Sequence, residues 1–166
     1  MAFLHPDLWL PDIHAITEEH LHALGVRGLM VDLDDTLVGS DDDSVPEDAL
    51  AWTTSWAARG FRVVILSNGR PERVARFAEA ARLPSFALAG KPLKKAFRNG
   101  LAALELRAEE SVMIGDQIFT DVLGAKLAGT KSILVNPVTQ AGLLHTRLLR
   151  RVEHHVLKGF QGGVQI

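Results

Sequence analysis

The acidic residue Asp32 directly follows the apolar run GLMV at residues 28–31, and a second acidic residue, Asp34, lies two positions further on. A run of this length and composition is typical of a strand that is buried on both faces of a parallel sheet. Ligands of open parallel sheets bind beyond the carboxyl ends of the strands, where these two carboxylates would lie. Side chains at alternate positions of an extended chain point the same way, so Asp32 and Asp34 could face one ligand.

Further polar residues recur at the ends of apolar runs in a consistent order: Ser67 and Asn68, then Lys91, then Asp116 and Asp121. The first two end the run RVVIL, and Asp116 ends the run SVMIG. Because parallel strands share one carboxyl edge, we expect these side chains to gather around the same crevice as the first two carboxylates.

In this order the residues resemble the signature of the haloacid dehalogenase superfamily, which is DxDxT, then a Ser or Thr, then a Lys, then GDxxxxD. The resemblance covers roughly residues 28–136. It implies a phosphatase in which Asp32 is the nucleophile and forms an aspartyl-phosphate. It also implies that Asp34 is the general acid and base. Dehalogenases of the superfamily lack an acid at the position of Asp34, because a halide leaves without a proton.

The same resemblance implies a cation, because a carboxylate attacks an anionic phosphate only when the negative charge is offset. Mg²⁺ prefers oxygen ligands, and the implied ligands are the Asp32 carboxylate, the Asp34 backbone carbonyl and the Asp116 carboxylate, with Asp121 supporting them. Ser67, with Asn68 beside it, would hold a phosphoryl oxygen. Lys91 would offset the charge of the carboxylates and of the phosphoaspartate.

Alternating apolar runs and helical patterns predict an α/β domain with a parallel sheet and helices on both faces. The expected strands lie near residues 28–33, 61–66, 85–89, 111–115 and 131–135, and the expected helices near 46–59, 71–82, 92–106 and 118–128. The superfamily resemblance implies a three-layer Rossmann-like fold with strand order 5-4-1-2-3. The intervals between Asp32, Ser67 and Lys91 are too short for a cap domain, which favours a bulky substrate or a homo-oligomer that closes the site.

We expect one domain over residues 1–166, made of an N-terminal lead (1–27), a catalytic core (28–136) and a C-terminal amphipathic helix at about 143–158. With 47% hydrophobic residues the chain can bury a sizeable core. A net charge of -2 argues against general nucleic-acid binding. The chain has no cysteine and shows no signal peptide or long apolar run, so we expect a cytoplasmic protein, with peripheral contact at the inner face of a membrane left open.

Longer stretches, among them SNGRPERV, AGKPLKKAF and VMIGDQIFTDVLGAKLAG, resemble the YqeG-type phosphatases, which are similar to mitochondrial phosphatidylglycerophosphate phosphatases. Two departures stand out. Asp35 and the pair Gly69-Arg70 occupy places where relatives commonly have Asn. Arg70 could reach a second phosphate or a head group, although a solvated residue at a helix start is the plainer interpretation.

The C-terminal segment combines an apolar stripe with a cationic side: Leu144, Leu148, Val152 and Val156, beside Arg147, Arg150, Arg151 and Lys158. One interpretation is a helix that docks its stripe on the domain. The other is contact with an anionic membrane, in which Arg147 would meet a lipid head group. The segment around Trp9 could join such a surface, but packing against the core is the preferred interpretation.

Three functions remain open from the sequence. The favoured one is a Mg²⁺-dependent phosphatidylglycerophosphate phosphatase, and the runner-up acts on a soluble phosphomonoester such as a sugar phosphate or a nucleotide. The third is a phosphoaspartate signalling module. Receiver domains of that kind have their Lys last, whereas Asp116 and Asp121 follow Lys91 here, so the order favours a phosphatase.

Overall fold

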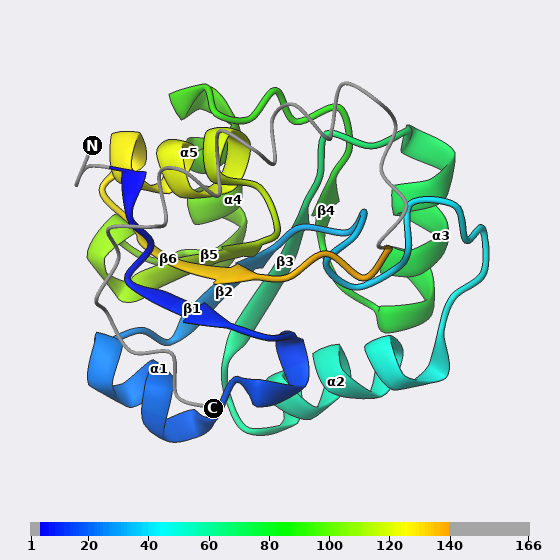
Figure 1. Ribbon diagram of the computed structural model, residues 1–166, viewed down its shortest axis with the longest axis horizontal. Helices are drawn as coiled ribbons and strands as arrows, with labels where there is room; N and C mark the ends of the chain where they lie inside the picture. Colours follow the sequence, from blue (N-terminus) through cyan, green and yellow to red (C-terminus); the bar gives the residue numbers. More distant parts are fainter. Residues whose placement is uncertain (1–3, 140–166) are drawn as a thin grey trace.

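The computed structural model describes residues 4–139. A six-stranded parallel sheet lies at the centre with helices on both faces (Figure 1). Its strands, in the spatial order β1-β6-β5-β2-β3-β4, are Leu8–Leu10, Lys131–Val135, Ser111–Gly115, Gly28–Val31, Arg62–Leu66 and Ser85–Phe86. Five of them have the predicted order. The sixth, β1, pairs with β6 from Leu8↔Ile133 to Leu10↔Val135 and extends the sheet by one strand.

Helices α1 (Glu18–Leu24), α2 (Glu47–Ala58) and α3 (Pro71–Ala81) cover one face of the sheet, while α4 (Lys94–Leu104) and α5 (Leu123–Ala128) cover the other (Figure 1). The alternation of side chains along β2 explains this division. Leu29 and Val31 pack in the core under α1 to α3, whereas Met30 packs with Phe97 of α4.

Two helices begin later than the sequence predicted. The expected helix from residue 92 is α4, which begins at Lys94, because residues 90–93 form a turn in which Leu93 N donates to Gly90 O. The expected helix at 118–128 begins with a π-helical segment, Ile118–Val122, before α5. The apolar segment around Trp9 forms β1, and Trp9 packs against a small buried cluster that includes Leu134. This agrees with the interpretation that the segment packs against the core.

The expected C-terminal helix at about 143–158, with Arg147, lies outside the described residues. Within residues 4–139, no insertion forms a second domain over the carboxyl edge of the sheet. None of the helices in that part of the chain is both long enough and apolar enough to cross a membrane.

Candidate active site at the carboxyl edge of the sheet

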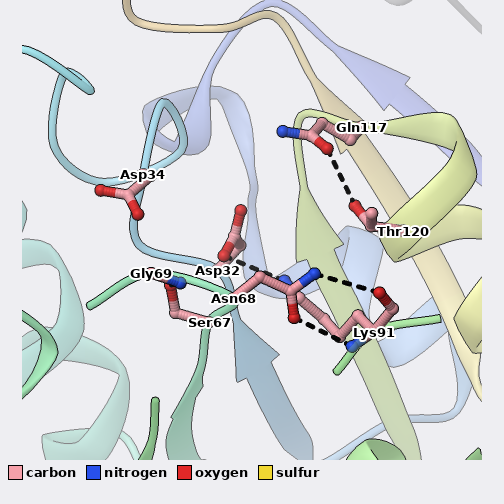
Figure 2. A pocket seen from close by; sticks show the side chains of 8 residues that line it. All are labelled: Asp32, Asp34, Ser67, Asn68, Gly69, Lys91, Gln117 and Thr120. Carbon is pink, nitrogen blue, oxygen red and sulfur yellow. Dashed lines mark hydrogen bonds and ion pairs between the residues drawn. The ribbon is translucent and has the colours of Figure 1, made fainter. Parts of the chain in front are cut away.

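The predicted residues meet where β2, β3 and β5 end. A pocket of about 200 Å³ opens there, and its lining comprises Asp32, Asp34, Ser67, Asn68, Gly69, Lys91, Gln117 and Thr120 (Figure 2). Strand register brings these groups together, because Val31 of β2 lies opposite Ile65 of β3 and Ile114 of β5. The backbone N–H of Asp32 continues this pairing by donating to Ile114 O at 2.9 Å.

Lys91 is the electrostatic centre of the site. Its buried ammonium lies 2.9 Å from Asp32 Oδ1 and donates to Asp121 Oδ1 at 2.7 Å. Burial lowers the pKa of Lys91, but the two carboxylates, Asp121 first, outweigh that effect and raise the pKa above its usual value. The side chain therefore stays charged inside the protein.

Three buried carboxylates, Asp32, Asp116 and Asp121, surround this single cation, with ligand atoms within 4.8 Å of one another. Burial, opposed chiefly by Lys91, raises the pKa of Asp32 to about 7. Burial together with the charges of Asp121 and Asp32 raises the pKa of Asp116 to about 9. The single ammonium of Lys91 thus does not offset the charge of three ionised carboxylates, and two of these groups bind protons more readily than free carboxyl groups do. The all-oxygen donor set of the cluster suits a metal ion.

Asp34 stands apart from that cluster. Its carboxylate lines the pocket but is directed away from Asp32, toward Gly69 (Figure 2). Oδ1 accepts from Nε of Arg73 at 2.5 Å. Asp32 and Asp34, which lie two residues apart in the sequence, therefore have different surroundings. Asp32 belongs to the charged cluster, and Asp34 lies at the rim of the pocket.

Ser67 and Asn68 follow β3. Ser67 is buried, and its Oγ accepts from the backbone N–H of Gly69 at 2.9 Å. Asn68 Oδ1 accepts from the N–H groups of Gly90 and Lys91, and its Nδ2 donates to Lys91 O (Figure 2). Asn68 therefore tethers the segment that carries Lys91, a contact that the prediction of substrate binding did not foresee.

Arg70 does not join the residues that line the pocket. It precedes α3 as the N-cap residue, and its side chain is 76% exposed, 3.9 Å from Asp43 Oδ1. This placement agrees with the plainer interpretation of a solvated residue at a helix start. The acidic stretch 41–43 is exposed, as a loop of that composition should be.

The sequence did not single out three residues that belong to the site. Gln117 and Thr120 line the pocket from within the GDxxxxD motif, with Thr120 Oγ1 donating to Gln117 Oε1 at 3.2 Å (Figure 2). Their position between two predicted site residues was the available signal. Arg73 contacts Asp34 across 39 residues of chain, and its only signal was its place in the first turn of a helix that begins at the pocket.

Comparison with known proteins agrees with this geometry. The family model described as "haloacid dehalogenase-like hydrolase" matches residues 7–129. A Bacillus subtilis protein described as "Probable phosphatase YqeG" is 37% identical over 159 residues, which is 96% of this chain and 92% of the relative. A glyceraldehyde 3-phosphate phosphatase of Pyrococcus abyssi is 32% identical over 83 residues, 45% of this chain and 35% of that enzyme.

Solved structures share the fold. The structure of a predicted HAD-like family hydrolase from Porphyromonas gingivalis superposes with a TM-score of 0.55 at 15% identity, covering 76% of this chain and 98% of that one. Residues 7–129, which the family model matches, include the strands β2, β3 and β5 whose ends form the pocket. The chain belongs to the haloacid dehalogenase-like hydrolases, and within them it is a phosphomonoester hydrolase similar to YqeG.

Proposed function

We propose that this phosphatase acts through an aspartyl-phosphate on Asp32 and requires Mg²⁺. The observation that carries the proposal is the position of the Lys91 ammonium, which lies between Asp32 and Asp121 at the base of the pocket. A carboxylate fixed beside a permanent cation can approach an anionic phosphate. Ser67, which lines the pocket after the neighbouring strand, would hold a phosphoryl oxygen.

The reaction has two steps. First, an Asp32 oxygen forms a bond to phosphorus while the bond to the ester oxygen breaks, and Asp34 gives a proton to the departing alcohol. Second, a water oxygen forms a bond to phosphorus, its proton passes to Asp34, and the acyl phosphate bond breaks. Asp32 regains its carboxylate, and the net products are the alcohol and inorganic phosphate.

The cluster of Asp32, Asp116 and Asp121 would hold the cation, because a hard ion such as Mg²⁺ is bound through carboxylate oxygens. When bound, Mg²⁺ supplies positive charge that offsets the developing charge on the phosphoryl oxygens. Gln117 N donates to Asp121 Oδ2 at 3.1 Å and thereby orients one of these carboxylates.

Phosphate release by purified protein tests the mechanism. Asp32→Asn should abolish release, whereas Asp41→Asn, which changes an exposed carboxylate, should leave it unchanged. Asp34→Asn given a phosphate ester with a good leaving group should accumulate a phosphoenzyme that mass spectrometry maps to Asp32. Turnover by Asp32→Asn at the wild-type rate would refute the covalent mechanism, and full activity in excess chelator would refute the metal.

As the substrate we propose a phosphorylated lipid head group, with phosphatidylglycerophosphate as the candidate. The support lies in the segment that carries Lys91. Leu88 and Leu93 on this segment are 66% and 67% exposed, and the exposed Lys94 and Lys95 follow them. Apolar and cationic side chains near a pocket that no second domain covers within residues 4–139 suit a substrate with an apolar body and an anionic head.

The runner-up substrate is a small soluble phosphomonoester. It is favoured by the relative from Pyrococcus abyssi, whose described substrate is glyceraldehyde 3-phosphate. The discriminating experiment measures phosphate release, with Mg²⁺ present, from phosphatidylglycerophosphate in micelles and from soluble sugar phosphates and nucleotides. A higher kcat/KM for the lipid supports the first substrate, and consistently faster release from a soluble ester selects the second.

A further inference from the structure

Arg73, in the first turn of α3, is the side chain that holds Asp34. Its guanidinium is only 11% exposed, and Nε donates to Asp34 Oδ1 at 2.5 Å. The remaining nitrogens bind the loop of residues 39–43, here called the acidic loop. Nη2 donates to Gly39 O at 2.6 Å, and Nη1 donates to the carbonyl of Asp42. The guanidinium of Arg73 thus joins Asp34, which lines the pocket, to the acidic loop.

The other oxygen of Asp34 is confined by Gly69. A Cβ at position 69 would overlap Asp34 Oδ2 and come within 3.0 Å of Ser67 Oγ, so the space that Oδ2 occupies exists because residue 69 has no side chain. Both Asp34 and Gly69 line the pocket. The carboxylate therefore has one oxygen fixed by Arg73 and the other lying over bare backbone at the pocket.

We propose that Arg73 is a positioning residue for Asp34, which it holds with Oδ2 placed to exchange a proton with the substrate. The inference rests on the proposed function, in which Asp34 is the general acid. In this chain, a larger residue at position 69 would displace the acid. Nothing in the contact requires Arg73 to touch the substrate itself.

Misplacing an acid has a specific kinetic signature. An alkoxide leaves only when it takes a proton as its bond to phosphorus breaks, whereas 4-nitrophenolate is stable enough to leave without one. Loss of Arg73 should therefore slow alkyl phosphates selectively. A general acid contributes about 10²–10⁴-fold, so Arg73→Met should lower kcat for glycerol 3-phosphate by about 100-fold and kcat for 4-nitrophenyl phosphate by only about 3-fold.

Arg76→Met is the matched control. Arg76 lies on the same helix and Nη1 donates to Asp43 O at 2.6 Å, so this variant loses a contact with the acidic loop and none with Asp34. It should slow neither ester by more than about 3-fold, well below the contribution of a general acid. Arg73→Lys, which keeps a cation beside Asp34, should recover part of the activity on glycerol 3-phosphate.

Equal losses on the two esters in Arg73→Met would overturn the proposal, because a purely structural role does not depend on the leaving group. Should that variant fail to fold, Gly69→Ala serves instead. Its Cβ would crowd both Asp34 and Ser67, so both esters should slow, and the loss on glycerol 3-phosphate should exceed the loss on 4-nitrophenyl phosphate. Asp34→Asn distinguishes the acid role of Asp34 from the positioning role of Arg73. If it lacks leaving-group selectivity, the acid role fails. If it shows selectivity but Arg73→Met and Gly69→Ala do not, only the positioning role fails.

Discussion

At the scale of single residues, the main feature of the site is that three buried carboxyl groups share the charge of one buried ammonium. Asp32, Asp116 and Asp121 face one another around the Lys91 ammonium, and burial raises the pKa of Asp116 to about 9. A carboxyl group with a raised pKa disfavours the folded state at neutral pH, because folding must either keep a proton on it or bury its charge. The arrangement therefore lowers stability, and it forms the carboxylate cluster that we propose as the Mg²⁺ site.

Replacing Asp116 should accordingly change metal binding and stability in opposite directions. Asp116→Asn removes one anionic ligand, so half-maximal activity should require roughly 10- to 100-fold more Mg²⁺. Without metal, the same variant should melt about 2–8 °C higher, since about 1 kcal/mol corresponds to a few degrees in a domain of this size. Mg²⁺ titrations of phosphate release and melting curves in chelator measure both effects. Glu79→Gln, an exposed change on α3, should alter neither, and a lower melting temperature for Asp116→Asn would contradict the charge argument.

At the scale of elements, one side chain, Asp7, adds to the backbone pairing that holds the edge strand β1. Asp7 precedes the strand, and its Oδ2 accepts from Ser132 N at 2.8 Å, from Ser132 Oγ at 2.9 Å and from Lys126 Nζ at 3.0 Å. Burial raises the pKa of Asp7, but Lys126 and Ser132 outweigh it, and the pKa falls below its usual value of 3.8. The carboxylate thus ties the N-terminal lead to β6 and α5.

Asp7→Asn should destabilise the protein by about 1–3 kcal/mol at neutral pH, the range for a hydrogen-bonded charged group. Because the pKa of Asp7 is lowered by folding, its contribution is present above pH 3.8 and disappears as the pH falls through the lowered pKa. The difference between wild type and variant in urea unfolding should therefore shrink toward zero in acid. Asp48→Asn, at a carboxylate that is 70% exposed, should cost less than about 0.5 kcal/mol. A difference that persists in acid would mean that the charge of Asp7 is not the cause.

Elements with a clear apolar run were predictable, and the elements set by tertiary contacts were not. The five core strands and their order follow from runs such as RVVIL and from the superfamily resemblance. The strand β1 has only three residues, which are too few to show the alternation of apolar and polar residues that indicates a strand. Its strand conformation depends on pairing with β6. Likewise, Asp32 and Asp116 were predictable because they directly follow strands, and Asp34 and Asp121 because their spacing matches the superfamily signature, whereas Arg73 reaches Asp34 from another element.

At the scale of the whole molecule, the helices of residues 4–139 leave the carboxyl edge of the sheet uncovered. The helices pack on the two faces of the sheet (Figure 1), and the pocket opens at the carboxyl ends of β2, β3 and β5. Within residues 4–139, the segments nearest to Lys91 are short, and they carry the exposed Leu88 and Leu93. The pocket, at about 200 Å³, is smaller than the roughly 300–1,000 Å³ of typical small-molecule sites, so much of a large substrate would lie on this rim.

The proposed lipid substrate makes the rim testable. Burying a leucine side chain contributes about 1.5–3 kcal/mol when it is complete, so Leu93→Ser should lower kcat/KM for phosphatidylglycerophosphate in micelles by about 10-fold, with 4-nitrophenyl phosphate unaffected. Leu127→Ser, at another exposed leucine on α5, is the control and should leave both substrates unchanged. The Leu88→Ser change should act in the same direction as Leu93→Ser. If both rim variants hydrolyse the lipid at the wild-type rate, the exposed leucines do not bind it, and a soluble ester becomes the better substrate hypothesis.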